Sequence, residues 1–85
     1  MIIQGKVQGV FYRANAADYA RSHDLIGWIK NRIDGTVECL AIGTEEKLQA
    51  FFKFCSSDPG YSQVDHIEAV WTIPTENFSD FKVVY

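Results

Sequence analysis

The sequence predicts an α+β sandwich in which two helices cover one face of an antiparallel sheet. The chain has 85 residues, enough for one small domain, and 47% of them are hydrophobic, as in globular proteins. Two segments carry the apolar spacing or small-residue face of a helix, and the segments around them have the character of strands. A single domain over residues 1–85 is predicted, because no repeat, low-complexity tract or linker divides the chain.

The first strand is predicted at Ile2–Val7, a short β-prone run close to the N-terminus. Residues 8–12 form a turn that contains a glycine, and a helix is predicted to follow over Ala14–Asp24. Small side chains allow a helix to lie close against a sheet. The small residues on one face of this helix are Ala16, Ala17 and Ala20.

A β-hairpin is predicted next, with strands at Ile26–Asn31 and Thr36–Ile42. The dipeptide Asp34-Gly35 between them is a strong hairpin signal, because glycine tolerates the positive φ of tight turns. Glu38 interrupts a return strand that is otherwise mostly apolar on both faces.

A second helix is predicted to begin after Thr44, which is a suitable N-cap. Two glutamates follow it, and they suit the positive end of the helix dipole. The helix is predicted to stop before the turn cluster Asp58-Pro59-Gly60. Its buried stripe is expected at i, i+3, i+4 and i+7, at Leu48, Phe51, Phe52 and Cys55.

The last two strands are predicted at Val64–Ile73 and at Phe81–Tyr85, where apolar residues alternate. The predicted order is therefore βαββαβ with a short C-terminal fifth strand, which is a ferredoxin-like sandwich. Right-handed crossovers would place the first and third strands side by side in the middle of the sheet. This fold hosts many functions and does not decide among them.

Composition and charge narrow the classes of partner. The formal net charge of −3 makes nucleic acid a poor candidate for a binding partner, since nonspecific binding to its phosphates needs an excess of Lys and Arg. Cys39 and Cys55 are too few for a disulfide scaffold and lack metal-ligand spacing, so buried, reduced thiols and no metal are expected. No hydrophobic run has transmembrane length and no signal peptide pattern is visible, so a cytoplasmic protein without membrane contact is expected.

The stretch GKVQGVFYR, residues 5–13, is the first candidate for chemistry. It lies between a predicted strand and a predicted helix, where backbone N–H groups can converge and the helix N-terminus adds partial positive charge. Gly9 would let the backbone curl around an anion, and Arg13 would add a fork of donors that matches phosphate. On its own the stretch is weak evidence for an anion site, and the favoured interpretation is a tight turn followed by a surface arginine.

Asn31 is the second candidate, at the end of a strand just before the hairpin turn. Asparagines in such places are mostly turn residues. A neutral amide can also donate and accept hydrogen bonds at once, so it can orient a water molecule.

Together these two stretches resemble the acylphosphatase family. GKVQGVFYR resembles the family signature at its glycines, its Val-Gln-Gly-Val core, its aromatic residue and its final arginine. GWIKNRIDGTVE resembles the second family signature at the right distance downstream, and the resemblance extends over essentially the whole chain. Two separated motifs at matching spacing are far more specific than either one alone.

The resemblance implies an enzyme that hydrolyses the carboxyl–phosphate bond of small acyl phosphates, without metal or cofactor. It implies that Arg13 binds the substrate phosphate and that Asn31 positions the attacking water. The N–H cradle would come from the loop backbone at Gln8, Gly9, Val10, Phe11 and Tyr12. The leaving carboxylate has a conjugate acid with a pKa of roughly 4, so it departs without a general acid.

Two alternatives stay open. A non-catalytic phosphate-binding or regulatory domain could keep the same cradle, and an RNA-binding sheet could share the topology. The acidic balance and the lack of a recognisable aromatic RNA-binding motif argue against RNA. The sequence has no designated interface stripe, so a monomer is expected, and its expected ligands are an acyl phosphate and inorganic phosphate. The chain departs from the family pattern in its short lead-in before the signature, in Phe11, where a smaller residue is common, and in Val84, where many members have arginine.

Overall fold

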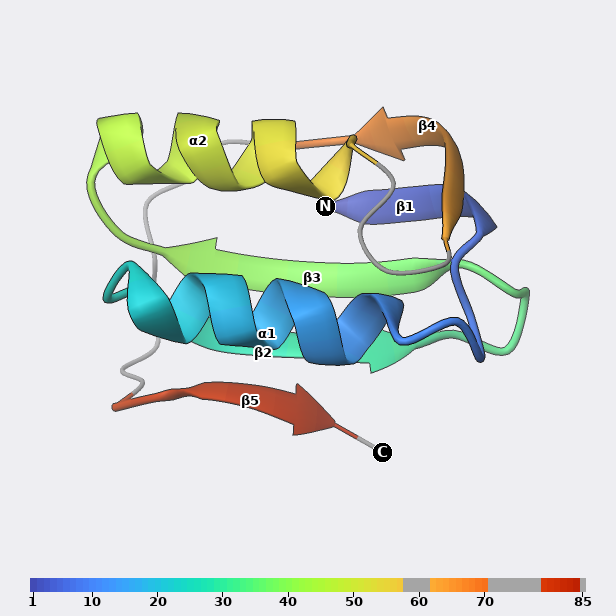
Figure 1. The fold of residues 1–85 in the computed structure, drawn as a ribbon, viewed down its shortest axis with the longest axis horizontal. Helices are drawn as coiled ribbons and strands as arrows, with labels where there is room; N and C mark the ends of the chain where they lie inside the picture. Colours follow the sequence, from blue (N-terminus) through green and yellow to red (C-terminus); the bar gives the residue numbers. More distant parts are fainter. Residues whose placement is uncertain (58–61, 71–78, 85) are drawn as a thin grey trace.

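The computed structural model describes residues 1–57, 62–70 and 79–84. Figure 1 shows two helices lying side by side across one face of a sheet. Along the chain the elements are β1 (Ile2–Lys6), α1 (Tyr12–Ser22), β2 (Ile26–Asn31), β3 (Val37–Ile42), α2 (Glu45–Cys55), β4 (Gln63–Glu68) and β5 (Phe81–Val84).

The sheet has five strands in the order β4-β1-β3-β2-β5. The first and third strands are neighbours, as right-handed crossovers require, and the predicted α+β ferredoxin-like class is confirmed. The four strands β1 to β4 pair antiparallel, whereas β5 runs parallel to β2, with Lys30 opposite Val84. The sheet is therefore mixed rather than wholly antiparallel.

The core lies between the sheet and the two helices. The alanine face of α1 is fully buried, and this lets α1 approach the sheet closely. Phe51 of α2 meets Phe81 of β5 edge to face at 5.9 Å between ring centroids, which joins the second helix to the edge strand. The largest fully buried side chains are Tyr12, Phe51, Phe81, Ile3, Leu25, Ile29, Val7, Val37 and Cys55.

Helix α2 begins as predicted, with Thr44 as its N-cap. The Lys47 backbone N–H donates to the Thr44 hydroxyl oxygen at 3.3 Å. Of the predicted stripe, Phe51 and Cys55 are buried, while Leu48 and Phe52 are only partly buried. The helix therefore meets the core along a narrower face than its apolar spacing predicts.

Several predicted boundaries change or fall outside the described residues. The fourth strand, expected to reach Ile73, ends at Glu68, and residues 71–73 are not described. The Asp58-Pro59-Gly60 turn and Tyr85 also lie outside the described part of the chain. Neither helix of the described part combines the length and the hydropathy needed to cross a membrane.

The pairing of the strands places the ends of β1, β2 and β5 at the same end of the sheet. β1 runs toward the same end as the β2–β3 turn, and the last residues of β5 lie beside the end of β2. Figure 1 shows that the start of α1 lies there as well, on the right of the view. Both stretches singled out in the sequence therefore meet at this end.

Candidate active site

The loop between β1 and α1 contains two residues in left-handed conformation. Gly9 has φ 70°, and Phe11 has φ 64° and ψ 16°. Glycine reaches this region at little cost, as predicted, but for phenylalanine it is uncommon. Left-handed residues within a turn can point successive N–H groups into one concavity, which is a common anion-binding arrangement.

The N-terminus of α1 differs from that of α2 in a way that suits an anion. Phe11 is the N-cap residue of α1 and makes no side-chain capping bond, and the first turn contains no acidic residue. Helix α2 instead has the Thr44 cap and two glutamates in its first turn. The partial positive charge at the start of α1 is therefore not balanced by a carboxylate of its own first turn.

Arg13 is the second residue of α1 and reaches across to β5. Its Nη1 donates to the carbonyl oxygen of Val84 at 3.0 Å. The bond holds the guanidinium at the end of the sheet where the loop lies. Arg13 also lines a cavity of about 290 Å³, together with Val7, Gly9, Phe11, Tyr12, Ala14 and Val83.

Asn31 is the last residue of β2, as predicted, and lies opposite Val37. Its Oδ1 atom is shielded from solvent and accepts no hydrogen bond from the described residues. A buried amide oxygen without a donor is uncommon and costs about 1–3 kcal/mol. Its presence at this end of the sheet is therefore a candidate functional feature.

The side chain of Gln8 joins the loop to the hairpin. Its Nε2 donates to the carbonyl oxygens of Arg32 at 2.8 Å and Thr36 at 2.9 Å. The sequence predicts only a backbone role for Gln8, and the structure adds this side-chain bridge. These two bonds span 24 and 28 residues of sequence, so no local pattern indicates them.

Asp34 stabilises the turn to which Gln8 binds. Its Oδ1 accepts hydrogen bonds from the Thr36 hydroxyl at 2.6 Å and the Thr36 backbone N–H at 3.0 Å. These bonds, the hydroxyl one above all, hold the pKa of the Asp34 carboxyl below its usual range. The hairpin after Asn31 is thus fixed by its own turn and by the loop.

The side chains of Val10 and Tyr12 serve packing. Tyr12 is 1% exposed, and its hydroxyl donates to the carbonyl oxygen of Cys55 at 2.9 Å, which ties the start of α1 to the end of α2. Val10 packs partly buried against the core. Contacts from these two residues to an anion would therefore come from the backbone, as the sequence predicts.

The two cysteines are free and buried, as predicted. Burial raises the pKa of both thiols, that of Cys55 to about 12. In the described part of the chain, no three His, Cys, Asp or Glu side chains lie close enough together to hold a metal ion.

Comparison with known proteins decides the family. The acylphosphatase family model matches residues 1–83. The chain belongs to the acylphosphatase family. An acylphosphatase of Pelotomaculum thermopropionicum is 35% identical over the whole chain and 92% of the relative.

Two solved structures of the family share the fold closely. The acylphosphatase of Bacillus subtilis matches with a TM-score of 0.94 and 38% identity over 99% of this chain and 93% of that one. An acylphosphatase of Coxiella burnetii matches with a TM-score of 0.87 and 33% identity over 98% and 86% of the two chains. Members of the family hydrolyse acyl phosphates, so the predicted hydrolase activity is confirmed and favoured over a non-catalytic binding domain.

Proposed function

We propose that the Gln8–Tyr12 loop and Arg13 hold the phosphoryl group of a small acyl phosphate while Asn31 aligns the attacking water. The observation that carries the proposal is the bridge from Gln8 to the hairpin. It fixes the loop with the arginine against the strand that ends in the asparagine. Different residues would thus bind the phosphoryl group and the water, and the Gln8 side chain would fix their relative position.

Three features support the phosphate half. The left-handed residues Gly9 and Phe11 curl the loop, and the first turn of α1 carries no carboxylate that would repel an anion. Arg13 presents a planar guanidinium at the same end of the sheet. Together these groups would stabilise the charge that spreads over the phosphoryl oxygens in a metaphosphate-like transition state.

The water half rests on the Oδ1 atom of Asn31. No donor among the described residues competes for this acceptor, and the side-chain amide could donate to and accept from a water molecule once its oxygen turns toward the site. Positioning of this kind lowers the barrier because the entropy of bringing the reactants together is lost before the chemical step.

The proposed reaction forms one bond and breaks one bond. The water oxygen attacks phosphorus, and the bond from phosphorus to the carboxyl oxygen breaks. RCO–OPO₃²⁻ and H₂O give RCO₂⁻ and H₂PO₄⁻. The carboxylate leaves without a proton, and a phosphoryl oxygen takes the proton of the water, so no protein base or metal ion is required. We expect residues 1–85 to form one domain, and we expect the enzyme to be monomeric and cytosolic and not to bind nucleic acid.

The direct test is hydrolysis of benzoyl phosphate by the purified protein in excess chelator. Arg13→Ala should weaken both inhibition by inorganic phosphate and turnover. Asn31→Ala should lower turnover about 100- to 1000-fold while phosphate still binds, as for loss of a preorganised polar group. Arg21→Ala is the matched control, since Arg21 also lies on α1 and donates to a β5 carbonyl, that of Phe81, at the other end of the strand.

Three results would contradict the proposal. Absence of hydrolysis contradicts the enzymatic role of this chain. Activity that disappears with chelator contradicts the metal-free mechanism. Full activity in Asn31→Ala contradicts the role of the amide, and phosphate binding without turnover in the native protein would favour the non-catalytic domain.

A further inference from the structure

We infer that Asn15 is a positioning residue for the phosphate-binding loop, because its side chain fixes the peptide group between Phe11 and Tyr12. That peptide group carries one of the N–H donors of the proposed cradle. The inference rests on the proposed function, since it assumes that the loop backbone and Arg13 bind the phosphoryl group. Asn15 acts through the loop backbone and not through contact with the substrate.

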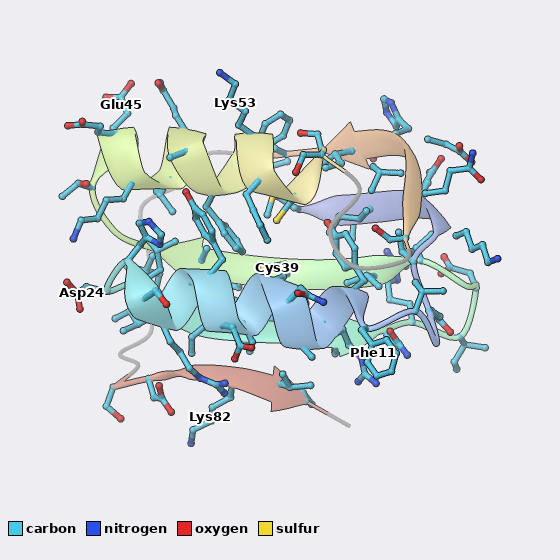
Figure 2. All side chains as sticks on the ribbon, in the orientation of Figure 1. Phe11, Asp24, Cys39, Glu45, Lys53 and Lys82 are labelled. Atoms are coloured by element: carbon cyan, nitrogen blue, oxygen red, sulfur yellow. The ribbon has the colours of Figure 1, made fainter. Side chains whose placement is uncertain are left out.

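The carbonyl oxygen of Phe11 accepts two hydrogen bonds from one residue. The Asn15 backbone N–H donates to it at 3.0 Å, and the Asn15 side-chain Nδ2 donates to it at 2.8 Å. The first bond is the one with which an α-helix ordinarily begins, because Phe11 is the N-cap residue of α1. The second bond is additional and is the shorter of the two. Figure 2 shows Phe11 at the start of α1, where the loop from β1 enters the helix.

The direction of the Phe11 carbonyl sets the direction of the Tyr12 N–H, because both groups belong to one planar peptide unit. In a trans peptide unit the carbonyl and the N–H point in opposite directions. The carbonyl points along α1 toward Asn15, so the N–H points out of the helix N-terminus, toward the side of the loop. Tyr12 and Arg13 both line the cavity of about 290 Å³ at this end of the helix. The two bonds to the carbonyl therefore aim one backbone donor at the proposed phosphate site.

This peptide unit needs support because the backbone conformation of Phe11 is strained. Its φ of 64° and ψ of 16° lie in the left-handed region, which is uncommon for a residue with a side chain. An N-cap residue is ordinarily extended, as Thr44 is at the start of α2, with φ −68° and ψ 154°. Without the side-chain bond, Phe11 can relax toward that ordinary conformation, and the Tyr12 N–H then changes its direction relative to the loop.

Asn15 is not the residue that helix stability alone favours at this position. Its neighbours are Ala14, Ala16 and Ala17, and asparagine has a lower helix propensity than alanine. Its side chain is only partly buried, whereas those of Ala16 and Ala17 are fully buried in the core. The bond to the Phe11 carbonyl therefore points to a role in the loop and not in the stability of the helix.

Loss of this bond should change how often the loop is ready to bind, and not the chemical step. When only a fraction of the molecules has the binding conformation, the apparent Kd rises in inverse proportion to that fraction. A bound substrate has already selected the binding conformation, so KM should rise while kcat stays nearly the same. One net hydrogen bond changes such an equilibrium by about three- to tenfold.

The test compares the native enzyme with Asn15→Ala and Asn15→Ser, with benzoyl phosphate as substrate and inorganic phosphate as inhibitor. Asn15→Ala should raise KM and the inhibition constant of phosphate by the same factor, about three- to tenfold, and leave kcat nearly unchanged. Asn15→Ser should restore most of the affinity, because a serine hydroxyl can donate to the carbonyl four residues earlier. Ser22 of the same helix does so, to the carbonyl oxygen of Asp18 at 2.8 Å.

Ser22→Ala is the matched control, since it removes a side-chain bond of the same span at the other end of α1. It should match the native enzyme in KM, kcat and inhibition by phosphate. Thermal unfolding adds a measure of the structural effect. Asn15→Ala should have a Tm close to that of the native protein, because the higher helix propensity of alanine offsets the lost bond. A merely structural role would instead lower Tm and leave both constants unchanged.

Three results would overturn the inference while leaving the proposed function in place. The first is an unchanged KM and phosphate inhibition in Asn15→Ala, and the second is a lower kcat with an unchanged KM. The third is an Asn15→Ser variant as weak in phosphate binding as Asn15→Ala. If the native enzyme does not hydrolyse benzoyl phosphate, or if Arg13→Ala is inhibited by phosphate like the native enzyme, the proposed function fails and the inference fails with it.

Discussion

The side-chain amide nitrogen of Gln8 lies 2.8 Å from the carbonyl oxygen of Arg32, so the loop after β1 is bound to the residue that follows Asn31. The same nitrogen lies 2.9 Å from the carbonyl oxygen of Thr36, on the other side of the turn. One amide group thereby spans the mouth of the hairpin. The distance between the proposed phosphate-binding loop and Asn31, which is proposed to position the water, depends on these two hydrogen bonds.

Gln8→Leu is expected to lower kcat by at least tenfold, because a displacement of about 1 Å between reacting groups can cost 100-fold in rate. It should also lower the free energy of unfolding by about 1–3 kcal/mol, since two hydrogen bonds are lost, although the Arg32 and Thr36 carbonyls keep the backbone donors of Gly35 and Arg32. A benzoyl phosphate assay measures kcat, and urea unfolding measures the free energy of unfolding. Gln4→Leu, at an exposed glutamine of β1, is the control, and equal kcat values in the two variants would contradict the bridging role.

Local patterns in the sequence predict most of the fold. The bounds of β2 are those predicted, because the hairpin turn at Asp34-Gly35 fixes where the strand must end. Helix α1 begins at Tyr12, two residues before the predicted start, because the alanine pattern becomes visible only from Ala14. The alternation of Phe81 and Val83 is the same in either strand direction, so it could not predict that β5 runs parallel to β2.

The sequence predicts which residues form the site, but it does not predict the hydrogen bonds that join them to the rest of the fold. Gly9 can be assigned a positive φ because glycine permits it, whereas nothing in the sequence marks Phe11 as left-handed. The bonds of Gln8 to the hairpin and of Arg13 to Val84 join residues 24 to 71 positions apart. Such contacts depend on the assembled sheet and not on spacing along the chain.

Asn31→Ala is expected to separate stability from activity. The variant removes a buried oxygen that has no donor among the described residues, so the free energy of unfolding should stay the same or rise by up to about 1 kcal/mol. Turnover should fall at the same time, as proposed above. Urea unfolding of the variant and the native protein measures the first effect, and a loss of stability above about 1 kcal/mol would show that the amide has a structural partner.

Gly27→Ala is expected to prevent normal folding of the sheet. Gly27 has φ 138°, and a Cβ atom there would overlap the carbonyl oxygen of Leu40, which belongs to the backbone of β3 and cannot move aside. Gly35→Ala is the matched control, since Gly35 also has positive φ, at 90°, but a Cβ atom there meets nothing within 4 Å. The control should lose only about 1 kcal/mol, the usual cost of a strained backbone residue.

Thermal unfolding followed by circular dichroism distinguishes the two glycine variants. Gly35→Ala should unfold cooperatively a few degrees below the native protein, because about 1 kcal/mol shifts Tm by roughly 4–8 °C in a domain of this size. Gly27→Ala should show no cooperative transition or a far lower Tm. Similar Tm values for both variants would contradict the close approach of β2 and β3 at this position.

The two buried thiols are expected to make stability fall in alkaline solution. Burial disfavours the thiolate and raises the pKa of Cys39 and Cys55, the latter to about 12, from an ordinary value of 9.0. The unfolded chain therefore loses thiol protons above pH 9, while the folded chain keeps them until the pH passes its raised pKa. The stabilisation is complete below pH 9 and is lost as the pH rises from 9 toward 12, by up to about 1.4 kcal/mol per pH unit for each thiol.

Urea unfolding at pH 8, 9 and 10 measures this slope. Other groups also titrate in this range, so the informative quantity is the difference between the native protein and Cys55→Ala. That variant should be less stable at pH 8, because a buried side chain is lost from a fully packed position, yet its stability should fall less steeply between pH 9 and 10. Equal slopes in the two proteins would mean that the Cys55 thiol ionises as readily in the folded chain as in the unfolded one.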